Sequence, residues 1–100
     1  MTLVYITCKD EKEAEKISLH LLRKRIIACA NIFPVKSFYW WNKRIANEKE
    51  YVAILKTNNK NFKKVESEVK RIHSYKIPCI LKLNSSANSE YELWASREMR

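Results

Sequence analysis

The absence of glycine is the feature that most restricts what this chain can fold into. Its 100 residues include no glycine, and its only prolines are Pro34 and Pro78. Glycine-rich loops that cradle a phosphate are therefore excluded, and with them the Rossmann and P-loop classes of nucleotide-binding protein. A length of 100 residues matches one ordinary domain. We therefore expect a single domain over residues 1–100.

Hydrophobic periodicity divides the chain into strand and helix signals. Short runs rich in β-branched and aromatic residues predict strands, and apolar residues recurring every three or four positions predict helices. Asp10 and Glu13 resemble a capping box at the start of the first helix. The expected elements are a strand at 3–7, a helix at about 10–25, a strand at 26–33 that resumes at 37–41, a strand at 51–57, a helix at 62–72, a strand at 78–83 and a short helical segment from 91.

This order of strand, helix, strand, strand, helix, strand is the split βαβ arrangement. It predicts an α+β, ferredoxin-like fold, with two helices on one face of an antiparallel four-stranded sheet. Pro34 interrupts a strand signal and therefore predicts an edge position or a bulge. The polar segment 42–44 predicts a hairpin turn, although it lacks the glycine that such turns favour.

The long central hairpin, expected from about residue 27 to 57, is apolar on both faces. Residues 38–41 are aromatic at every position and residues 51–55 are apolar throughout, whereas a strand with one wet face alternates polar and apolar residues. An apolar hairpin that overhangs a small domain is an aggregation hazard unless another chain covers it. We expect oligomerisation, and the competing interpretation is a locally dense monomer core.

Charge and cysteine usage restrict the partners. Lys and Arg number 20 against 11 Asp and Glu, a net charge of +9, but no basic run reaches the five or six residues typical of a nucleic-acid-binding tail. The three cysteines are odd in number and widely spaced, which does not indicate a disulfide framework. No signal peptide or membrane-spanning stretch is apparent. We expect a cytoplasmic protein with a solvated basic surface and no membrane partner.

Six short segments carry a family resemblance. They are residues 7–11 (TCKDE), 28–34 (ACANIFP), 37–41 (SFYWW) with Ile45, 54–57 (ILKT), 73–78 (HSYKIP) and 91–94 (YELW). In this order they resemble the TxPDE, ACxNIxP, SxYWW, ILKT, HPYxxP and YLxW motifs of the CutA, or divalent-cation tolerance, family. The resemblance implies a ferredoxin-like fold assembled as a homotrimer by strand pairing between subunits. It also implies a response to, or binding of, divalent or soft metal ions such as copper.

The chain departs from the family pattern at several positions. Ser74 stands where the family has proline, Cys79 where it commonly has glutamate, and Lys43 where the hairpin turn has glycine. The segment between Pro34 and Ser37 is one residue shorter. None of these changes threatens the fold, but Ser74 and Cys79 adjoin the expected site.

His73 and Cys79 are the candidate metal ligands, with Cys29 as an alternative source of the thiolate. Family members proposed to bind copper use a first-strand cysteine and a histidine pair, and the resemblance places these at Ile6, Ile72 and His73, so that only His73 remains. Cys8 lies on the same strand face as Ile6 and is an alternative thiol. Soft copper prefers thiolate and imidazole ligands. The competing interpretation makes His73 a structural partner of a tyrosine and makes the cysteines small buried hydrophobes.

An inter-subunit pocket is the second candidate site. Its expected residues are Cys29, Tyr39, Trp40, Lys56 and Tyr75, since tyrosine and tryptophan line pockets with polar ends and lysine contacts anions. This would suit a PII-like signalling trimer that binds a small anionic effector. An RNA-recognition module shares the fold, but its glycine-containing motif is absent, and we expect no specific nucleic acid. No catalytic set is apparent, so we expect no enzyme activity.

Overall fold

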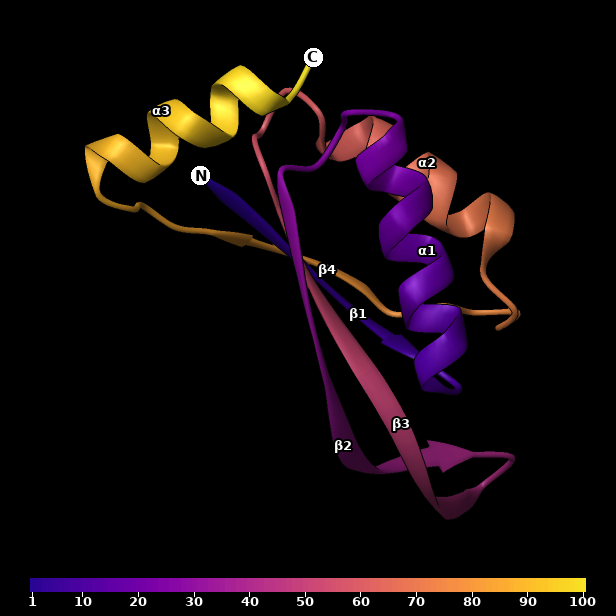
Figure 1. The fold of residues 1–100 in the computed structure, drawn as a ribbon. Helices are drawn as coiled ribbons and strands as arrows, with labels where there is room; N and C mark the ends of the chain where they lie inside the picture. Colours follow the sequence, from indigo (N-terminus) through magenta and orange to yellow (C-terminus); the bar gives the residue numbers. More distant parts are fainter.

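Four strands form one antiparallel sheet in the order β2-β3-β1-β4 in the computed structural model, which describes residues 1–100. Helices α1 and α2 cover one face of this sheet, and α3 lies apart from them, near the N-terminus (Figure 1). The expected ferredoxin-like α+β arrangement is therefore confirmed. The elements are β1 Thr2–Cys8, α1 Glu11–Arg23, β2 Cys29–Trp41, β3 Arg44–Thr57, α2 Phe62–Ile72, β4 Ile80–Asn84 and α3 Ser89–Glu98.

The second strand, β2, starts later than the sequence predicted. It begins at Cys29 instead of residue 26, because Ile26 and Ile27 leave the sheet and pack into the core. It then runs unbroken through Pro34, with register from Cys29 opposite Lys56 onwards. Proline fits there because β2 is an edge strand, where an outward-facing position needs no amide donor. The edge alternative is therefore correct and no bulge is needed.

The hairpin turn is tight although it lacks glycine. Trp41 lies opposite Arg44, so that only Asn42 and Lys43 connect the strands. Their φ angles are 50° and 63°, both in the left-handed region that a type I′ turn requires. Asparagine tolerates this region, whereas lysine carries the usual steric penalty of a Cβ atom. Lys43 is thus a strained position on an exposed turn.

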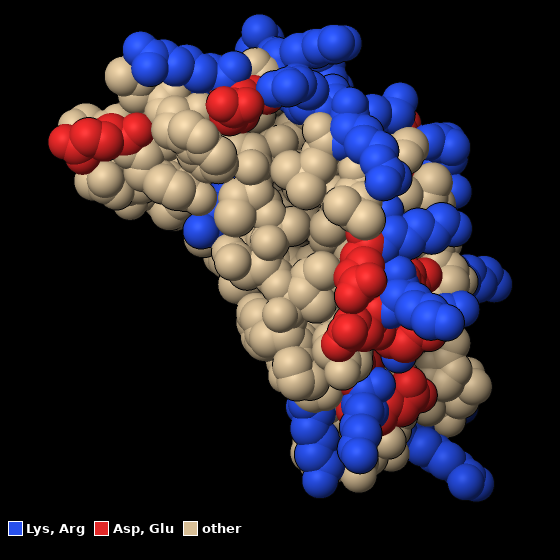
Figure 2. Space-filling view, viewed as in Figure 1, with Lys and Arg blue, Asp and Glu red and all other residues tan.

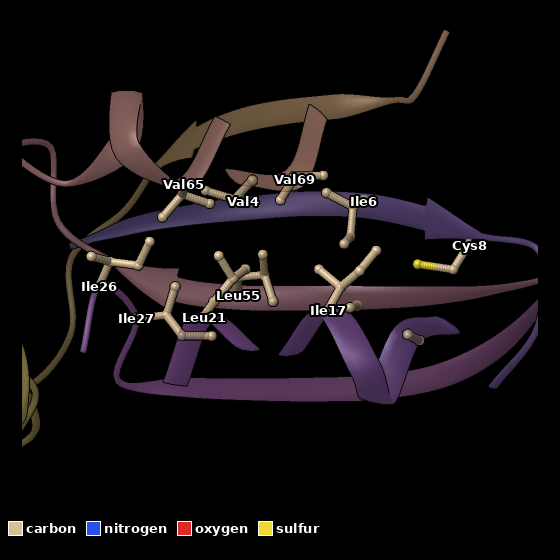
Figure 3. Packing of buried hydrophobic residues seen from close by; sticks show 12 residues of the cluster. Val4, Ile6, Cys8, Ile17, Leu21, Ile26, Ile27, Leu55, Val65 and Val69 are labelled. Atoms are coloured by element: carbon tan, nitrogen blue, oxygen red, sulfur yellow. The ribbon is translucent and has the colours of Figure 1, made fainter. Parts of the chain in front are cut away.

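The core lies between the sheet and the two helices. Alternate residues of β1 point toward the helices and meet the apolar stripes of α1 and α2, as Figure 3 shows for Ile6, Ile17 and Val69. The α1 N-terminus is capped by Asp10, whose Oδ1 accepts the Glu13 amide at 2.8 Å. The return bond of the predicted capping box is different, because Glu13 Oε1 accepts the Lys9 amide.

The opposite face of the sheet is uncovered, and we call it the open face. Figure 2 shows mostly uncharged surface along the hollow between α3 and the hairpin, interrupted by a basic side chain just below α3, with Lys and Arg crowded on the side of α1 and α2. Leu81 and Leu83 of this face are 50% and 47% exposed. The hairpin tip extends beyond the body of the molecule, and its Trp40 is 72% exposed. The dense monomer core considered from the sequence is therefore wrong for the hairpin. The large apolar residues of the open face are Leu3, Tyr5, Phe33, Ile54, Leu81 and Leu83, and Lys56 lies on the same face opposite Leu3.

Candidate functional site

Three potential metal ligands meet where β1 ends, α1 begins and the chain leaves α2. Strand alternation turns Cys8 toward the helices, on the same side as Ile6. Glu13 lies in the first turn of α1, and His73 directly follows α2. One donor atom from each of Cys8, Glu13 and His73 lies within 4.8 Å of the other two. We call these three residues the Cys8 cluster.

Glu13 connects two segments of backbone through its carboxylate. Oε1 accepts the Lys9 amide at 3.0 Å, and Oε2 accepts the Ser74 amide at 2.9 Å. Burial opposes the charge, but the hydrogen bonds from Ser74 and Lys9 outweigh burial and hold the pKa of Glu13 below its ordinary 4.5. The carboxylate is therefore ionised at neutral pH, although the residue is only 8% exposed.

The backbone determines the tautomer of His73. Nε2 lies 2.8 Å from the carbonyl oxygen of Thr7, which can only accept, so Nε2 carries the proton. Nδ1 accepts the Tyr75 amide at 3.0 Å and lies 4.0 Å from Glu13 Oε2. The expected link between His73 and a tyrosine thus exists, but it uses the Tyr75 backbone. A ring N–H donated to a backbone carbonyl is also how metal-binding histidines are commonly oriented, which makes Nδ1 the available ligand atom.

Cys8 is a wholly buried thiol. Burial, followed by the charges of Glu13, Glu50 and Asp10, raises the pKa of the thiol to about 12. The side chain is therefore protonated at neutral pH and is not an activated nucleophile. Because metals bind the thiolate, metal binding here would have to release this proton.

The donor set of the Cys8 cluster suits a soft or borderline cation. Thiolate, imidazole and carboxylate together are ligands that copper and zinc accept. Metal–ligand bonds of about 2.0–2.3 Å in a tetrahedron place ligand atoms roughly 3.3–3.8 Å apart. The cluster, whose donors lie within 4.8 Å, would contract by about 1 Å. His73 Nδ1 would also exchange the Tyr75 amide for the metal, so the residues fit at the expense of one hydrogen bond and one proton.

A separate cavity of about 700 Å³ lies between the hairpin and residues 74–79, and we call it the hairpin pocket. Tyr39, Trp40 and Tyr75 of the predicted inter-subunit pocket line it, and so does Cys79. Cys79 thus belongs to the pocket lining and is not one of the three donors gathered around His73. Burial, followed by the charge of Glu50, raises the pKa of the Cys79 thiol.

Cys29 and Lys56 lie elsewhere. They face each other at the base of the hairpin, outside the hairpin pocket. The Lys56 ammonium lies 3.4 Å from the Tyr91 hydroxyl and 5.1 Å from the centre of that ring, so Lys56 connects the sheet to α3. The five predicted pocket residues therefore divide into a group of three that lines one cavity and a pair that does not.

Three candidate functional residues were not identified as such from the sequence pattern. Glu13 was interpreted only as a helix cap, and nothing in its spacing indicates that it also meets the segment after α2. Glu48 and Glu50 line the hairpin pocket, and the Tyr75 hydroxyl donates to Glu50 Oε2 at 2.6 Å. A usable signal existed for this pair, because two carboxylates two residues apart on a strand share one face.

The sheet order, the two helices on one face and the long hairpin define the class of protein, a ferredoxin-like α+β fold. The same fold occurs in the PII-like protein CutA from Nostoc sp. PCC 7120, with a TM-score of 0.93, 21% identity and coverage of 100% of this chain and 98% of that one. At that identity the likeness extends to the fold alone. No helix is long and apolar enough to cross a membrane.

Sequence comparison narrows the class to one family. The family model "CutA1 divalent ion tolerance protein" matches residues 2–98. The divalent-cation tolerance protein CutA of Archaeoglobus fulgidus is 48% identical over 77 residues, which cover 77% of this chain and 76% of that protein. A solved structure from the same organism, named a periplasmic divalent cation tolerance protein CutA, has a TM-score of 0.95 at 40% identity and 98% coverage of both chains. CutA1 from Pyrococcus horikoshii has a TM-score of 0.97 at 37% identity, with 100% and 99% coverage. The chain belongs to the CutA1 divalent ion tolerance family.

Proposed function

We propose that the chain acts, as a single domain, in a cytoplasmic homotrimer that binds divalent or soft metal ions such as copper and responds to them. The observation that carries the metal function is the Cys8 cluster, with thiol, carboxylate and imidazole donors within 4.8 Å of one another. The cytoplasmic location is supported by three free cysteines. One relative bears the name periplasmic, so fractionation of the source cells is the test of location.

The open face and the hairpin support self-association. Phe38, Trp40 and Ile45 on the hairpin are 63%, 72% and 65% exposed, and large contiguous apolar surfaces of this kind mark interaction sites. A trimer closes by head-to-tail contacts between different patches, which suits a projecting hairpin and a hollow apolar face on the same chain. Hairpin residues of one subunit would then cover the open face of the next.

Light scattering at micromolar concentration tests this assembly. We expect a particle of three times the chain mass of 12.0 kDa. Ile45→Asp on the hairpin should shift the particle toward monomer, whereas Leu19→Asp on the outer side of α1, 46% exposed, should leave it unchanged. A monodisperse monomer for the unmodified chain contradicts the assembly.

Calorimetric titration with Cu(I), Cu(II) and Zn(II) tests the metal function. We expect Cys8→Ser and His73→Ala each to weaken binding by at least about tenfold, the scale seen when even outer-shell partners of a metal are lost. Cys79→Ser is the matched thiol control and should have little effect. If only Cys79→Ser weakens metal binding, the metal site lies in the hairpin pocket instead. If all three variants bind metal as tightly as the unmodified chain, His73 has only a structural role.

A binding role suits these groups better than catalysis. The Glu13 carboxylate accepts two backbone amides, both ring nitrogens of His73 are hydrogen-bonded, and the Cys8 thiol is wholly buried. A catalytic nucleophile or base needs a lowered thiol pKa or a free lone pair. Assays for hydrolysis of generic ester and phosphate substrates should therefore detect no turnover.

The hairpin pocket favours a second candidate function, a PII-like signalling trimer that binds a small ligand. The cavity volume of about 700 Å³ falls within the range typical of small-molecule sites. Lys56, on which the sequence-based expectation of an anionic effector relied, does not line it. Titration with phosphate and common nucleotides tests whether an anionic effector binds, and we expect no binding of these anions in the hairpin pocket.

A further inference from the structure

The carboxylates of the hairpin pocket have no cationic partner in their own chain. Glu48 and Glu50 both line the cavity, yet neither takes part in any of the ion pairs that the chain forms. Four other acidic residues, Asp10, Glu11, Glu15 and Glu90, also form no ion pair, so what distinguishes Glu48 and Glu50 is that they share one cavity. Lys76 is the only basic residue in the lining, so the fixed charges of the cavity sum to a negative value.

Glu50 is a buried residue, only 6% exposed. Its Oε2 accepts the Tyr75 hydroxyl at 2.6 Å, and Oε1 has no hydrogen-bond donor from the chain. Burying a carboxylate is unfavourable unless a cation or several donors compensate it. The Tyr75 hydroxyl is the only donor from the chain, and Oε1 is not sealed off from the solvent of the cavity, so water supplies the rest of the compensation. A positively charged ligand in the cavity would replace that water with an opposite charge.

Aromatic rings form much of the remaining wall. Tyr39, Trp41 and Tyr75 line the cavity together with the two carboxylates. The faces of aromatic rings attract cations, and tryptophan does so most strongly. Rings that surround a negative group are the arrangement that recognises ammonium ions, including quaternary ones that cannot donate hydrogen bonds. A bare divalent metal would gain little from such walls, because it prefers oxygen, nitrogen or sulfur ligands.

We propose that the hairpin pocket binds a small organic ammonium ion, with Glu48 and Glu50 as its counter-charges and the aromatic rings as its walls. This inference rests on the second candidate function above, the binding of a small ligand, and names the class of that ligand. The pocket adjoins the Cys8 cluster, because Thr7 and Ser74 contact the cluster and also line the pocket. The two sites nevertheless use different charged groups: Cys8 points to the helix side of the sheet, whereas Glu50 aligns with the residues of the open face.

Choline and its uncharged isostere 3,3-dimethyl-1-butanol form a matched pair of probes. The full chain in its native oligomeric state is titrated with each at low salt by calorimetry, with tryptophan fluorescence as the second readout. We expect choline to bind and the isostere to bind at least about tenfold more weakly. A tenfold difference in affinity lies between the attraction of two unit charges about 4 Å apart in bulk water and their attraction near a protein surface. Added salt should weaken choline binding.

Glu48→Gln and Glu50→Gln should each reduce choline affinity about tenfold for the same reason. Glutamine retains an acceptor for the Tyr75 hydroxyl, so Glu50→Gln preserves that contact. Glu15→Gln, an exposed change on α1 that alters net charge equally, is the control and should have no effect. Equal binding of choline and the isostere, or phosphate binding in the pocket, overturns the ligand class but retains a small-ligand function. No binding by any of the three probes overturns both.

Discussion

Glu13→Gln is the most informative single change, because Glu13 joins the start of α1 to the segment that follows α2. Its two oxygens accept the Lys9 and Ser74 amides, which lie far apart in sequence. Glutamine keeps the shape and one acceptor oxygen, but its amide nitrogen would face a backbone N–H. One of the two hydrogen bonds is therefore lost, and one buried donor is left unpaired.

The magnitude follows from these contacts. A hydrogen bond to a charged acceptor contributes about 1.5–3 kcal/mol, and an unsatisfied buried donor costs about 1–3 kcal/mol. Partial relaxation of the segment after α2 reduces the sum, so we expect Glu13→Gln to lower the free energy of unfolding by about 2–4 kcal/mol. That is a large part of a typical total of about 5–15 kcal/mol.

The pH dependence distinguishes the carboxylate from mere packing. The fold holds the pKa of Glu13 below 4.5, so its contribution is complete above that unfolded-state value and disappears as pH falls through the folded-state pKa. The difference between the unmodified chain and Glu13→Gln should be full at pH 7 and should shrink below about pH 4.

Urea unfolding followed by circular dichroism measures this difference at both pH values. Unmodified and variant chains are compared at equal concentration, because association stabilises by mass action. Glu15→Gln, exposed on the same helix, should change the free energy of unfolding by less than about 0.5 kcal/mol. A loss below that size for Glu13→Gln at pH 7, or one that persists unchanged in acid, refutes the reasoning.

Three further outcomes are expected. Asp10→Ala removes the acceptor of the Glu13 amide and should destabilise the chain by about 1 kcal/mol in urea unfolding; an unchanged midpoint contradicts this. Lys43→Gly relieves a φ of 63° and should stabilise by about 1 kcal/mol, so a lower Tm in calorimetry would show that the turn is not strained. Copper affinity at the Cys8 cluster should rise about tenfold per pH unit as the bound metal displaces the thiol proton, and a flat profile between pH 6 and 8 argues against Cys8 as a ligand.

Element order and face polarity were readable from the sequence because they depend on local spacing. The stripe from Phe62 to Ile72 predicted α2 with its observed bounds, and the β-branched run near the N-terminus predicted β1. The hairpin does expose large apolar side chains, as the sequence predicted, but one of its faces also carries Glu48 and Glu50. Bounds failed where tertiary packing overrides local pattern, as at Ile26 and Ile27, which continue a strand signal but pack into the core instead.

The Cys8 cluster and the hairpin pocket are formed by residues that lie far apart in the sequence. The spacing of residues along the chain cannot predict such contacts. His73 was identified from the sequence, but its partners Cys8 and Glu13 come from β1 and α1, and only the packing of these elements brings the donors together. Lys56 was expected in a pocket because of its residue type. The strand register instead places Lys56 opposite Cys29, and its ammonium group contacts the hydroxyl of Tyr91 on α3. Composition and periodicity thus determined the architecture, whereas three-dimensional proximity alone decided which charges face which cavity.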